Sequence, residues 1–284
     1  MFKAGKIDWL GRPLRPWEPF FSKIHSNLFH PAASMVHWCV FNVKVFPLNH
    51  IKIRQALAAA ICRQEIIQAL STDLIPARSP LPLEHSQFKK NYEENKMKAR
   101  ALFDEALEEI GIKKENFPIL TLICLKGNIR ESTAMMLKKQ WEECLDIYCR
   151  IESYDRYALF DKMTQGDYQI GGMTWKSLFN DPIYTLNAFR YQDDLINFSK
   201  WENHEYQNVL DTANMEGDLP KRNVYFAKAE TILIEELPLI PLYYEFENFI
   251  KNDNLEISLS AAHIDFKWVS IKNTTKKGDS HVDE

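Results

Sequence analysis

Hydrophobic positions from residue 118 onward follow two alternating patterns. Short runs rich in β-branched and aromatic residues alternate with longer segments in which apolar side chains recur at helical spacing. The pattern predicts a β-α-β-α-β series over residues 119–125, 129–145, 147–152, 156–163 and 168–173. Strands that alternate with helices in this way pair in parallel through right-handed crossovers, so we expect an α/β lobe.

The flanking segments carry patterns of the same kinds. The run over 34–43 is rich in β-branched and aromatic residues and predicts a buried strand. One long helix is expected over 51–70 with Asn49 as its cap, and another over 93–110 that ends at Gly111, because glycine best tolerates a left-handed conformation. The other predicted elements are a strand over 7–10, a short helix over 17–25, helices over 205–215 and 219–236, and strands over 238–244 and 249–269.

The segment over 166–190 joins a predicted strand to a helix through an aromatic turn. Asn180 or Asp181 can accept hydrogen bonds from the first turn of that helix, and Pro182 suits its first position because no needed donor is lost there. Trp175 then lies at the carboxyl end of a strand, where open α/β sheets bind ligands. The alternative interpretation is that Trp175 is one more aromatic residue of the core.

Length and charge narrow the classes of function. A chain of 284 residues with 45% hydrophobic content can bury a large core and is long enough for two domains or lobes. Its formal net charge of −4 argues against nucleic acid as a partner, since basic residues do not dominate. We expect no bilayer-spanning segment, because no apolar run approaches the roughly 18 residues that a membrane helix needs.

The cysteines and the chain ends bear on the compartment. The five cysteines show neither a C-x-x-C pair nor a zinc-ligand spacing, and their odd number disfavours a disulfide framework. We expect most of them to be buried small apolar residues. The first residues lack the basic-then-apolar order of a secretory signal, so the chain as written is expected to stay in the cytoplasm. The polar end over 274–284 is expected to be disordered.

Motifs of common enzymes are absent from the sequence. It contains no G-x-S-x-G, no H-E-x-x-H and no glycine-rich phosphate loop. The spacing of His25, His30 and His37 does not match a common metal site, and isolated loop histidines are the simpler interpretation. We therefore expect no enzymatic activity, no metal and no cofactor.

Several segments together resemble a known family. Phe41-Asn42 is followed by Pro-Leu-Asn-His-Ile-Lys-Ile-Arg-Gln-Ala-Leu over 47–57 and by Arg-Gln-Glu-Ile-Ile over 63–67. Trp175 with Asp181-Pro182, and Ile-Pro-Leu-Tyr-Tyr over 240–244, come later in the chain. This combination resembles the periplasmic oligopeptide-binding proteins of extracellular solute-binding protein family 5, which are the solute-binding subunits of peptide ABC importers.

The resemblance implies an α/β fold of the type II periplasmic-binding-protein kind, in which a peptide is bound in a cleft between two lobes that close about a hinge. The chain resembles only the carboxyl-terminal half of such a protein. It implies lobe II over 42–244, remnants of lobe I over 1–41 and 245–273, and hinge crossovers near 38–42 and 243–245. It also implies a periplasmic monomer that acts with the permease subunits of an importer.

The resemblance further indicates which residues contact an oligopeptide ligand. Arg130 stands where some members place a basic residue near the peptide carboxylate; the alternative is a solvated residue in the first turn of a helix. Well-known members bind the peptide amino terminus with an aspartate three residues after the tryptophan, but this chain has Leu178 there. Asp181, one helical turn further on, is the candidate substitute; the alternative is that its oxygens are occupied by the helix cap. The expected ligand-binding residues are Trp175, Gly172, Met173, Thr174, Ser177, Asp181, Arg130 and Tyr244.

The sequence leaves two functions open. The first is a truncated or divergent peptide-binding subunit of an importer, in which contacts with the ligand stabilise the closed lobes. The second is an orphan fragment of such a protein that has an exposed lobe interface and binds no ligand. Co-purified peptide would favour the first.

Overall fold

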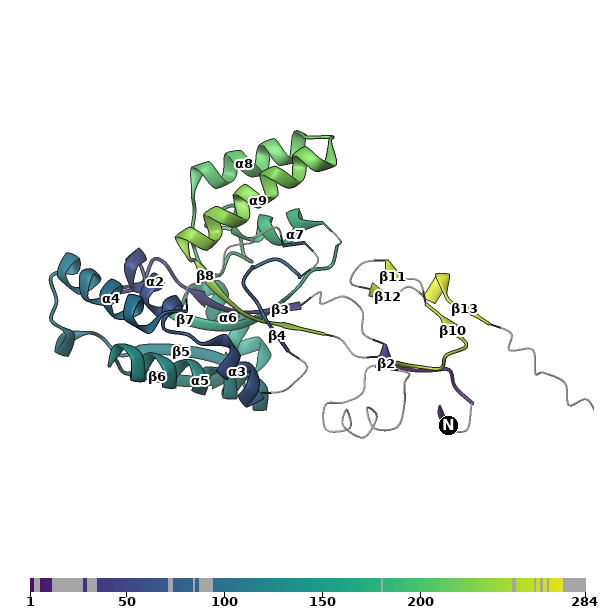
Figure 1. Cartoon of the computed structure of the whole chain (residues 1–284), viewed down its shortest axis with the longest axis horizontal. Helices are drawn as coiled ribbons and strands as arrows, with labels where there is room; N and C mark the ends of the chain where they lie inside the picture. The colour runs from purple at the N-terminus through teal and green to yellow at the C-terminus, as the bar shows by residue number, and fades with distance from the viewer. Residues whose placement is uncertain are drawn as a thin grey trace, which may run out of the picture. The chain divides into compact units, whose positions relative to one another are not determined.

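The computed structural model divides the chain into two compact units. The larger spans residues 33–245, and the smaller combines residues 1–32 with 246–284 (Figure 1). The division falls before the strand over 35–41, which the resemblance placed in lobe I; the assignment of segments to lobes stays a prediction. The structure describes residues 1–2, 6–11, 28–29, 35–70, 74–83, 85–86, 94–179, 181–246, 249–257, 259–260, 263–264 and 266–272.

A six-stranded mixed sheet forms the centre of the larger unit, in the order β4-β8-β3-β7-β5-β6. β5 pairs in parallel with both β6 and β7, which confirms the predicted parallel β-α-β-α-β series. β3 lies antiparallel between β7 and β8. The strands are β3 (Met35–Phe41), β4 (Ile75–Pro76), β5 (Leu120–Leu125), β6 (Cys149–Tyr154), β7 (Ile170–Lys176) and β8 (Leu239–Glu245).

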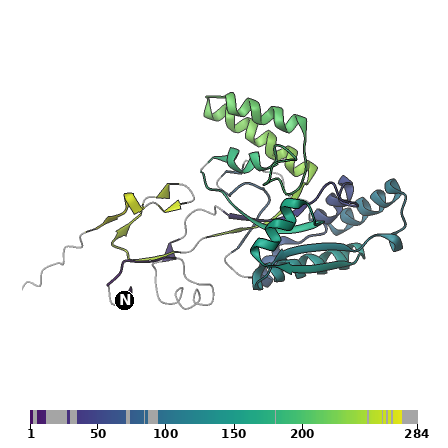
Figure 2. The ribbon, with the colours of Figure 1, turned by 180° about the vertical axis from the view of Figure 1, so that it is seen from behind.

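Helices surround this sheet, and two of them, α8 and α9, form a hairpin that projects from it (Figures 1 and 2). Side chains of α2 to α5 and of the sheet make up the main apolar cluster. The described helices of the larger unit are α2 (Ile51–Ala59), α3 (Arg63–Leu70), α4 (Lys96–Ile110), α5 (Asn128–Leu145), α6 (Arg156–Gln165), α7 (Pro182–Leu186), α8 (His204–Met215) and α9 (Leu219–Glu236), with short 3₁₀ turns η3 (Lys114–Asn116) and η4 (Asn187–Phe189).

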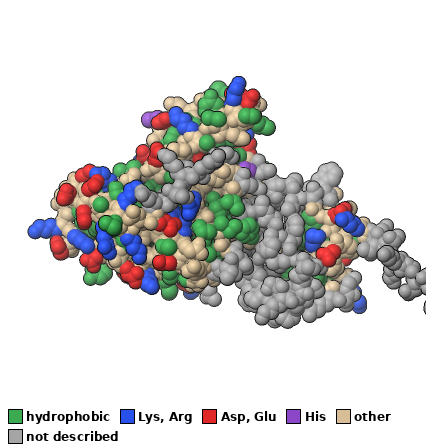
Figure 3. Space-filling model, viewed as in Figure 1, with side chains coloured by type: hydrophobic (Ala, Val, Ile, Leu, Met, Phe, Trp, Pro, Cys, Tyr) green, Lys and Arg blue, Asp and Glu red, His purple; other side chains and the backbone are tan. Residues whose placement is uncertain are grey.

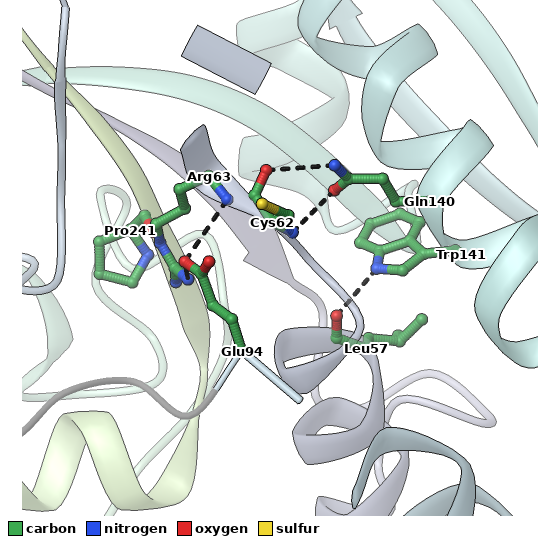
Figure 4. Close-up of polar contacts among 7 residues, drawn as sticks. All are labelled: Leu57, Cys62, Arg63, Glu94, Gln140, Trp141 and Pro241. Atoms are coloured by element: carbon green, nitrogen blue, oxygen red, sulfur yellow. Dashed lines mark hydrogen bonds and ion pairs between the residues drawn. The ribbon is translucent and has the colours of Figure 1, made fainter. Parts of the chain in front are cut away.

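The single helix predicted over 51–70 is wrong, because the chain forms two helices there, α2 and α3. Asn49 is not the predicted cap either, since the N-cap position of α2 is His50, whose side chain makes no capping hydrogen bond. Side chains of α5 replace the helical hydrogen bonds at the break (Figure 4). The Trp141 indole N–H donates to the Leu57 carbonyl at 2.9 Å. The Gln140 amide accepts from the Cys62 N–H and donates to the Cys62 carbonyl, both at 3.1 Å. Backbone groups at the break are therefore satisfied by residues far away in sequence.

A bulge in β8 sets the direction of its last side chains. Trp38 pairs with Pro241 but His37 pairs with Tyr243, so Leu242 is an extra residue on β8. The buried guanidinium of Arg63 donates to the Pro241 carbonyl at 2.7 Å and to Glu94 at 3.0 Å (Figure 4). Side chains of a strand point alternately to its two faces, and an extra residue reverses this order for the residues that follow. The side chains of β8 after Leu242 therefore point to the opposite faces from those expected without the bulge.

The smaller unit is built from short antiparallel pairings. Its three-stranded sheet has the order β1-β9-β2, and the Trp9 ring stacks on Phe249 with centroids 5.3 Å apart. The helix expected over 17–25 and the tail over 274–284 lie outside the described residues. The strands are β1 (Trp9–Gly11), β2 (Leu28–Phe29), β9 (Phe249–Lys251), β10 (Leu255–Glu256), β11 (Leu259–Ser260), β12 (His263–Ile264) and β13 (Ser270–Ile271), with a 3₁₀ turn η5 (Phe266–Trp268).

The cysteines and the helices bear on two expectations from the sequence, the absence of a disulfide framework and of a membrane-spanning segment. All five cysteines are free thiols, and four are buried while Cys62 is half-buried. Among the residues that the structure describes, no helix has the length and apolar character needed to cross a bilayer.

Candidate functional site at the carboxyl edge of the sheet

We call carboxyl edge the edge of the sheet at which β5, β6, β7 and β8 end and β3 begins. β5 lies between β6 and β7, so the crossover through α5 runs from β5 to β6 and the crossover through α6 runs back in the opposite direction, past β5 to β7. Ligands of open α/β sheets bind outside the carboxyl ends of strands at such a reversal. Met35 pairs with Glu245 at this edge, so both segments that join the two units leave the larger unit side by side.

The reversal leaves part of β7 without a second neighbour. β7 pairs with β5 only at Ile170 and Gly171. From Gly172 to Lys176 it pairs with β3 alone. Within the described residues, the side of β7 that faces away from β3 has no strand partner over this stretch. An extended chain could pair there through main-chain hydrogen bonds.

Arg130 reaches the carboxyl edge because α5 begins directly after β5. One guanidinium nitrogen, Nη1, donates to the Tyr243 hydroxyl at 3.0 Å and forms an ion pair with Glu245. Thr133 donates its hydroxyl hydrogen to the Ile129 carbonyl at 2.7 Å. The Tyr243 hydroxyl must therefore donate to the Thr133 oxygen, 2.9 Å away, while it accepts from Arg130.

This network fixes the charge of Arg130. Burial lowers the pKa of its guanidinium, but the hydrogen bond and charge of Glu245 outweigh that effect, so the pKa is raised. The Arg130 side chain is 14% exposed, so it is not a solvated surface residue. In the described part of the chain its Nε and Nη2 atoms have no recorded hydrogen bond. They remain available for a carboxylate.

His37 joins the same group of side chains through the sheet. Its ring stacks on Tyr243 with centroids 5.0 Å apart, and Nδ1 lies 3.0 Å from the Thr174 hydroxyl. Burial, followed by the charge of Arg130, holds the pKa of His37 well below its usual value, so the ring is neutral. A Cβ added at Gly172 would lie 3.7 Å from Nε2 of His37, which is an ordinary contact. His37 lies in β3, within the strand predicted over 34–43, so the interpretation of His37 as an isolated loop histidine is wrong; His25 and His30 lie outside the described residues.

Trp175 lies inside β7, because this strand continues to Lys176 instead of ending near Met173 as predicted. The indole is 7% exposed and stacks on Trp38 with centroids 5.2 Å apart. Its N–H donates to the Thr185 hydroxyl at 2.9 Å. The structure thus places Trp175 in an aromatic core, which is the alternative that the sequence left open.

The remaining expected site residues have structural partners of their own. Ser177 is buried and donates to the Phe179 carbonyl at 2.8 Å. Asp181 caps α7, as predicted, by accepting from the Ile183 N–H at 3.0 Å. Its other oxygen accepts from Arg222 at 2.6 Å. Asn180, the other predicted cap, lies outside the described residues.

The structure therefore sorts the expected residues into two groups. Arg130, Thr174 and Gly172 gather around His37 and Tyr243. Trp175 and Tyr244 instead lie across Val36 from each other, and both are buried. Burial, followed by the charge of Glu230, raises the pKa of the Tyr244 hydroxyl. Met173 pairs with Trp38.

Two hollows in the larger unit lie away from the carboxyl edge. One of about 520 Å³ is lined by Ile119, Lys138 and Tyr148, near the beginnings of β5 and β6. Another of about 310 Å³ is lined by Gly166 and Gln169, near the beginning of β7. Neither hollow is lined by an expected ligand-binding residue. The candidate site is therefore the stretch of β7 that pairs on one side only, together with Arg130 and the side chains that it contacts.

The mixed sheet, its reversal and the paired chain segments at one edge define a class, the type II periplasmic-binding-protein fold. The solved structure of a periplasmic oligopeptide-binding protein from Borrelia burgdorferi matches with a TM-score of 0.77 at 22% identity, over 93% of this chain and 53% of that one. The match therefore covers most of this chain and about half of that protein.

The family model of bacterial extracellular solute-binding proteins, family 5, matches residues 1–196. The chain belongs to this family, which confirms the resemblance seen in the sequence. The oligopeptide-binding protein OppA of Bacillus subtilis (strain 168) is 31% identical over 266 residues, 90% of this chain and 49% of that protein. The probable deoxycholate-binding periplasmic protein YgiS of Escherichia coli (strain K12) is 28% identical, over 86% of this chain and 46% of that protein. The chain spans about half the length of these relatives.

Proposed function

We propose that this chain is a solute-binding component of an ABC-type peptide importer that binds an extended oligopeptide at the carboxyl edge. The observation that carries the proposal is the stretch of β7 from Gly172 to Lys176, which pairs on one side only. Peptide main chain would add a strand to that side, as in other cases of strand addition. Membership of a solute-binding family supports this function over catalysis.

Arg130 would bind the carboxylate of the peptide. A guanidinium pairs well with a planar carboxylate, and two of its nitrogens have no recorded partner in the described residues. Tyr243 and Thr133 hold the guanidinium in place by a hydrogen-bond series that runs in one direction. The partners proposed with this function are the permease subunits of an importer, and the chain would act as a monomer in the periplasm.

Strand addition can be tested with the ligand alone. Tripeptides to pentapeptides would be screened by native mass spectrometry, and one that binds would be prepared with N-methyl groups at alternate amides. Only alternate amides of a strand face its neighbour, so one methylated set should weaken binding about tenfold while the complementary set leaves it unchanged. Equal effects of both sets would contradict strand addition. If no peptide binds, the orphan-fragment alternative is favoured.

The role of Arg130 needs a variant that leaves no buried unpaired charge. We expect Arg130→Gln combined with Glu245→Gln to weaken peptide binding about tenfold by calorimetry, because the carboxylate loses its cation. The control is Lys52→Gln combined with Glu109→Gln, an exposed ion pair among the mixed charges over α2 and α4 (Figure 3). Unchanged affinity in the Arg130 variant would remove this residue from the site.

A further inference from the structure

The chain that follows β7 presents apolar side chains at the carboxyl edge. Ser177 turns inward to bond the Phe179 carbonyl, and Leu178 and Phe179 are 38% and 62% exposed. This pair directly follows the one-sided stretch of β7, so an extended ligand that continues along β7 would meet it.

Phe179 is the outer end of a series of aromatic contacts. Its ring meets Tyr184 edge-on with centroids 5.3 Å apart, and Tyr184 lies 5.6 Å from Trp175. Trp175 stacks on Trp38, which is fully buried. We call Phe179, Tyr184, Trp175 and Trp38 the aromatic series. It gives the exposed ring a rigid support, because each member is packed against the next.

The carboxylate next to this series in sequence is already engaged. One oxygen of Asp181 caps α7 and the other accepts from Arg222. The Arg222 guanidinium also lies 4.6 Å from the centre of the Phe226 ring, so both charges have fixed partners. A ligand ammonium that loses water here would gain no free anion from Asp181, and a desolvated unpaired charge is unfavourable.

From these observations we propose that the end of the ligand lying over Leu178 and Phe179 is apolar and uncharged. For a peptide this is an amino-terminal end without a free ammonium, since Arg130 draws the carboxylate end to itself. The inference rests on the proposed function and adds the chemical class of the ligand: a peptide with a blocked amino terminus and an apolar first residue.

The test compares matched ligands on the full chain. Phe-Ala-Ala-Ala and Leu-Ala-Ala-Ala would each be titrated by calorimetry as the free amine and as the N-acetyl form. The wild-type chain is expected to bind the acetylated peptides at least as tightly as the free amines. Leu178→Asp should reverse this order by about tenfold, because it supplies a carboxylate for the ammonium. Leu178→Asn, of the same shape without the charge, should keep the wild-type order.

A second variant tests the apolar contact. Phe179→Ala should weaken binding of the acetylated peptides several-fold, whereas Leu195→Ala, at another exposed apolar residue, should not. A wild-type preference for the free amine over the acetylated form would overturn the inference while leaving the proposed function intact. Leu178→Asp without effect on the order would show that the ligand end lies elsewhere. If no form of either peptide binds and the wider screen also fails, the proposed function falls as well.

Discussion

Arg130 and Glu245 differ in how much of each side chain is buried, and this difference predicts unequal effects of removing them. Glu245 is 3% exposed whereas Arg130 is 14% exposed. Arg130→Met removes the guanidinium partner of a buried carboxylate and should lower the free energy of unfolding by about 3 kcal/mol. Glu245→Gln should lower the free energy of unfolding by less, because the Arg130 guanidinium keeps its hydrogen bond to Tyr243 and its partial exposure to water. Urea denaturation of both variants measures the difference; equal losses would contradict this account.

His37 makes the stability of the larger unit depend on pH. Its folded-state pKa lies well below its usual value because of burial and then the charge of Arg130, while in the unfolded chain it is about 6.5. Below that value the unfolded state binds a proton that the folded state excludes. The His37 contribution is therefore complete above about pH 6.5 and falls by up to about 1.4 kcal/mol per pH unit as the solution becomes more acidic.

The variant His37→Phe isolates this contribution. Phenylalanine can keep the stacking on Tyr243 but has no titrating nitrogen. Urea midpoints at pH 7 and pH 5 should differ more for the wild-type chain than for the variant. An equal change in both would show that His37 is not the group responsible.

Asp181 makes two contacts with different helices, and substitutions can separate their contributions to stability. It caps α7 through one oxygen and pairs with Arg222 of α9 through the other. Asp181→Asn should keep the cap and lose only the ion pair, whereas Asp181→Ala should lose both and be less stable by about 1 kcal/mol more. Thermal unfolding of the two variants compares these costs. Asp181→Asn should also leave peptide affinity unchanged, because this carboxylate is not assigned to the ligand.

Helix caps and the alternation of strands and helices could be predicted from local sequence. The caps at Gly111 and Asp181 and the parallel series around β5 were predicted correctly, because each depends on neighbours along the chain. The break between α2 and α3 was missed, since Gln140 and Trp141 satisfy its backbone from a distant helix. The end of β7 was placed too early, because pairing with β3 extends it to Lys176.

Residues 33–245 should fold without the rest of the chain. All members of the main apolar cluster lie between Cys39 and Tyr243, and the two ends of this segment meet where Met35 pairs with Glu245. A shortened chain of residues 33–245 should therefore unfold cooperatively on heating and protect its sheet amides from hydrogen exchange. Rapid exchange throughout β3 and β8 would show that the smaller unit is needed for the sheet.

The contacts that connect the residues of the candidate site could not be predicted from local sequence. Arg130 and Thr174 were expected at the ligand, but nothing in the local pattern indicated that His37 and Tyr243 connect them. The bulge in β8 is responsible, because one extra residue brings Tyr243 beside His37. Trp175 was expected at the ligand from its place near a strand end, yet Trp38 and Thr185 hold it in the core.

Local patterns predicted the α/β character of the larger unit, the caps at Gly111 and Asp181 and the family, since periodicity, caps and motifs are properties of adjacent residues. The fold, by contrast, sets which side of β7 is left unpaired, which charges are already engaged and which aromatic ring stays exposed. These depend on strand order and register, which join residues more than a hundred positions apart, and a shift of one residue moves a side chain to the other face of the sheet.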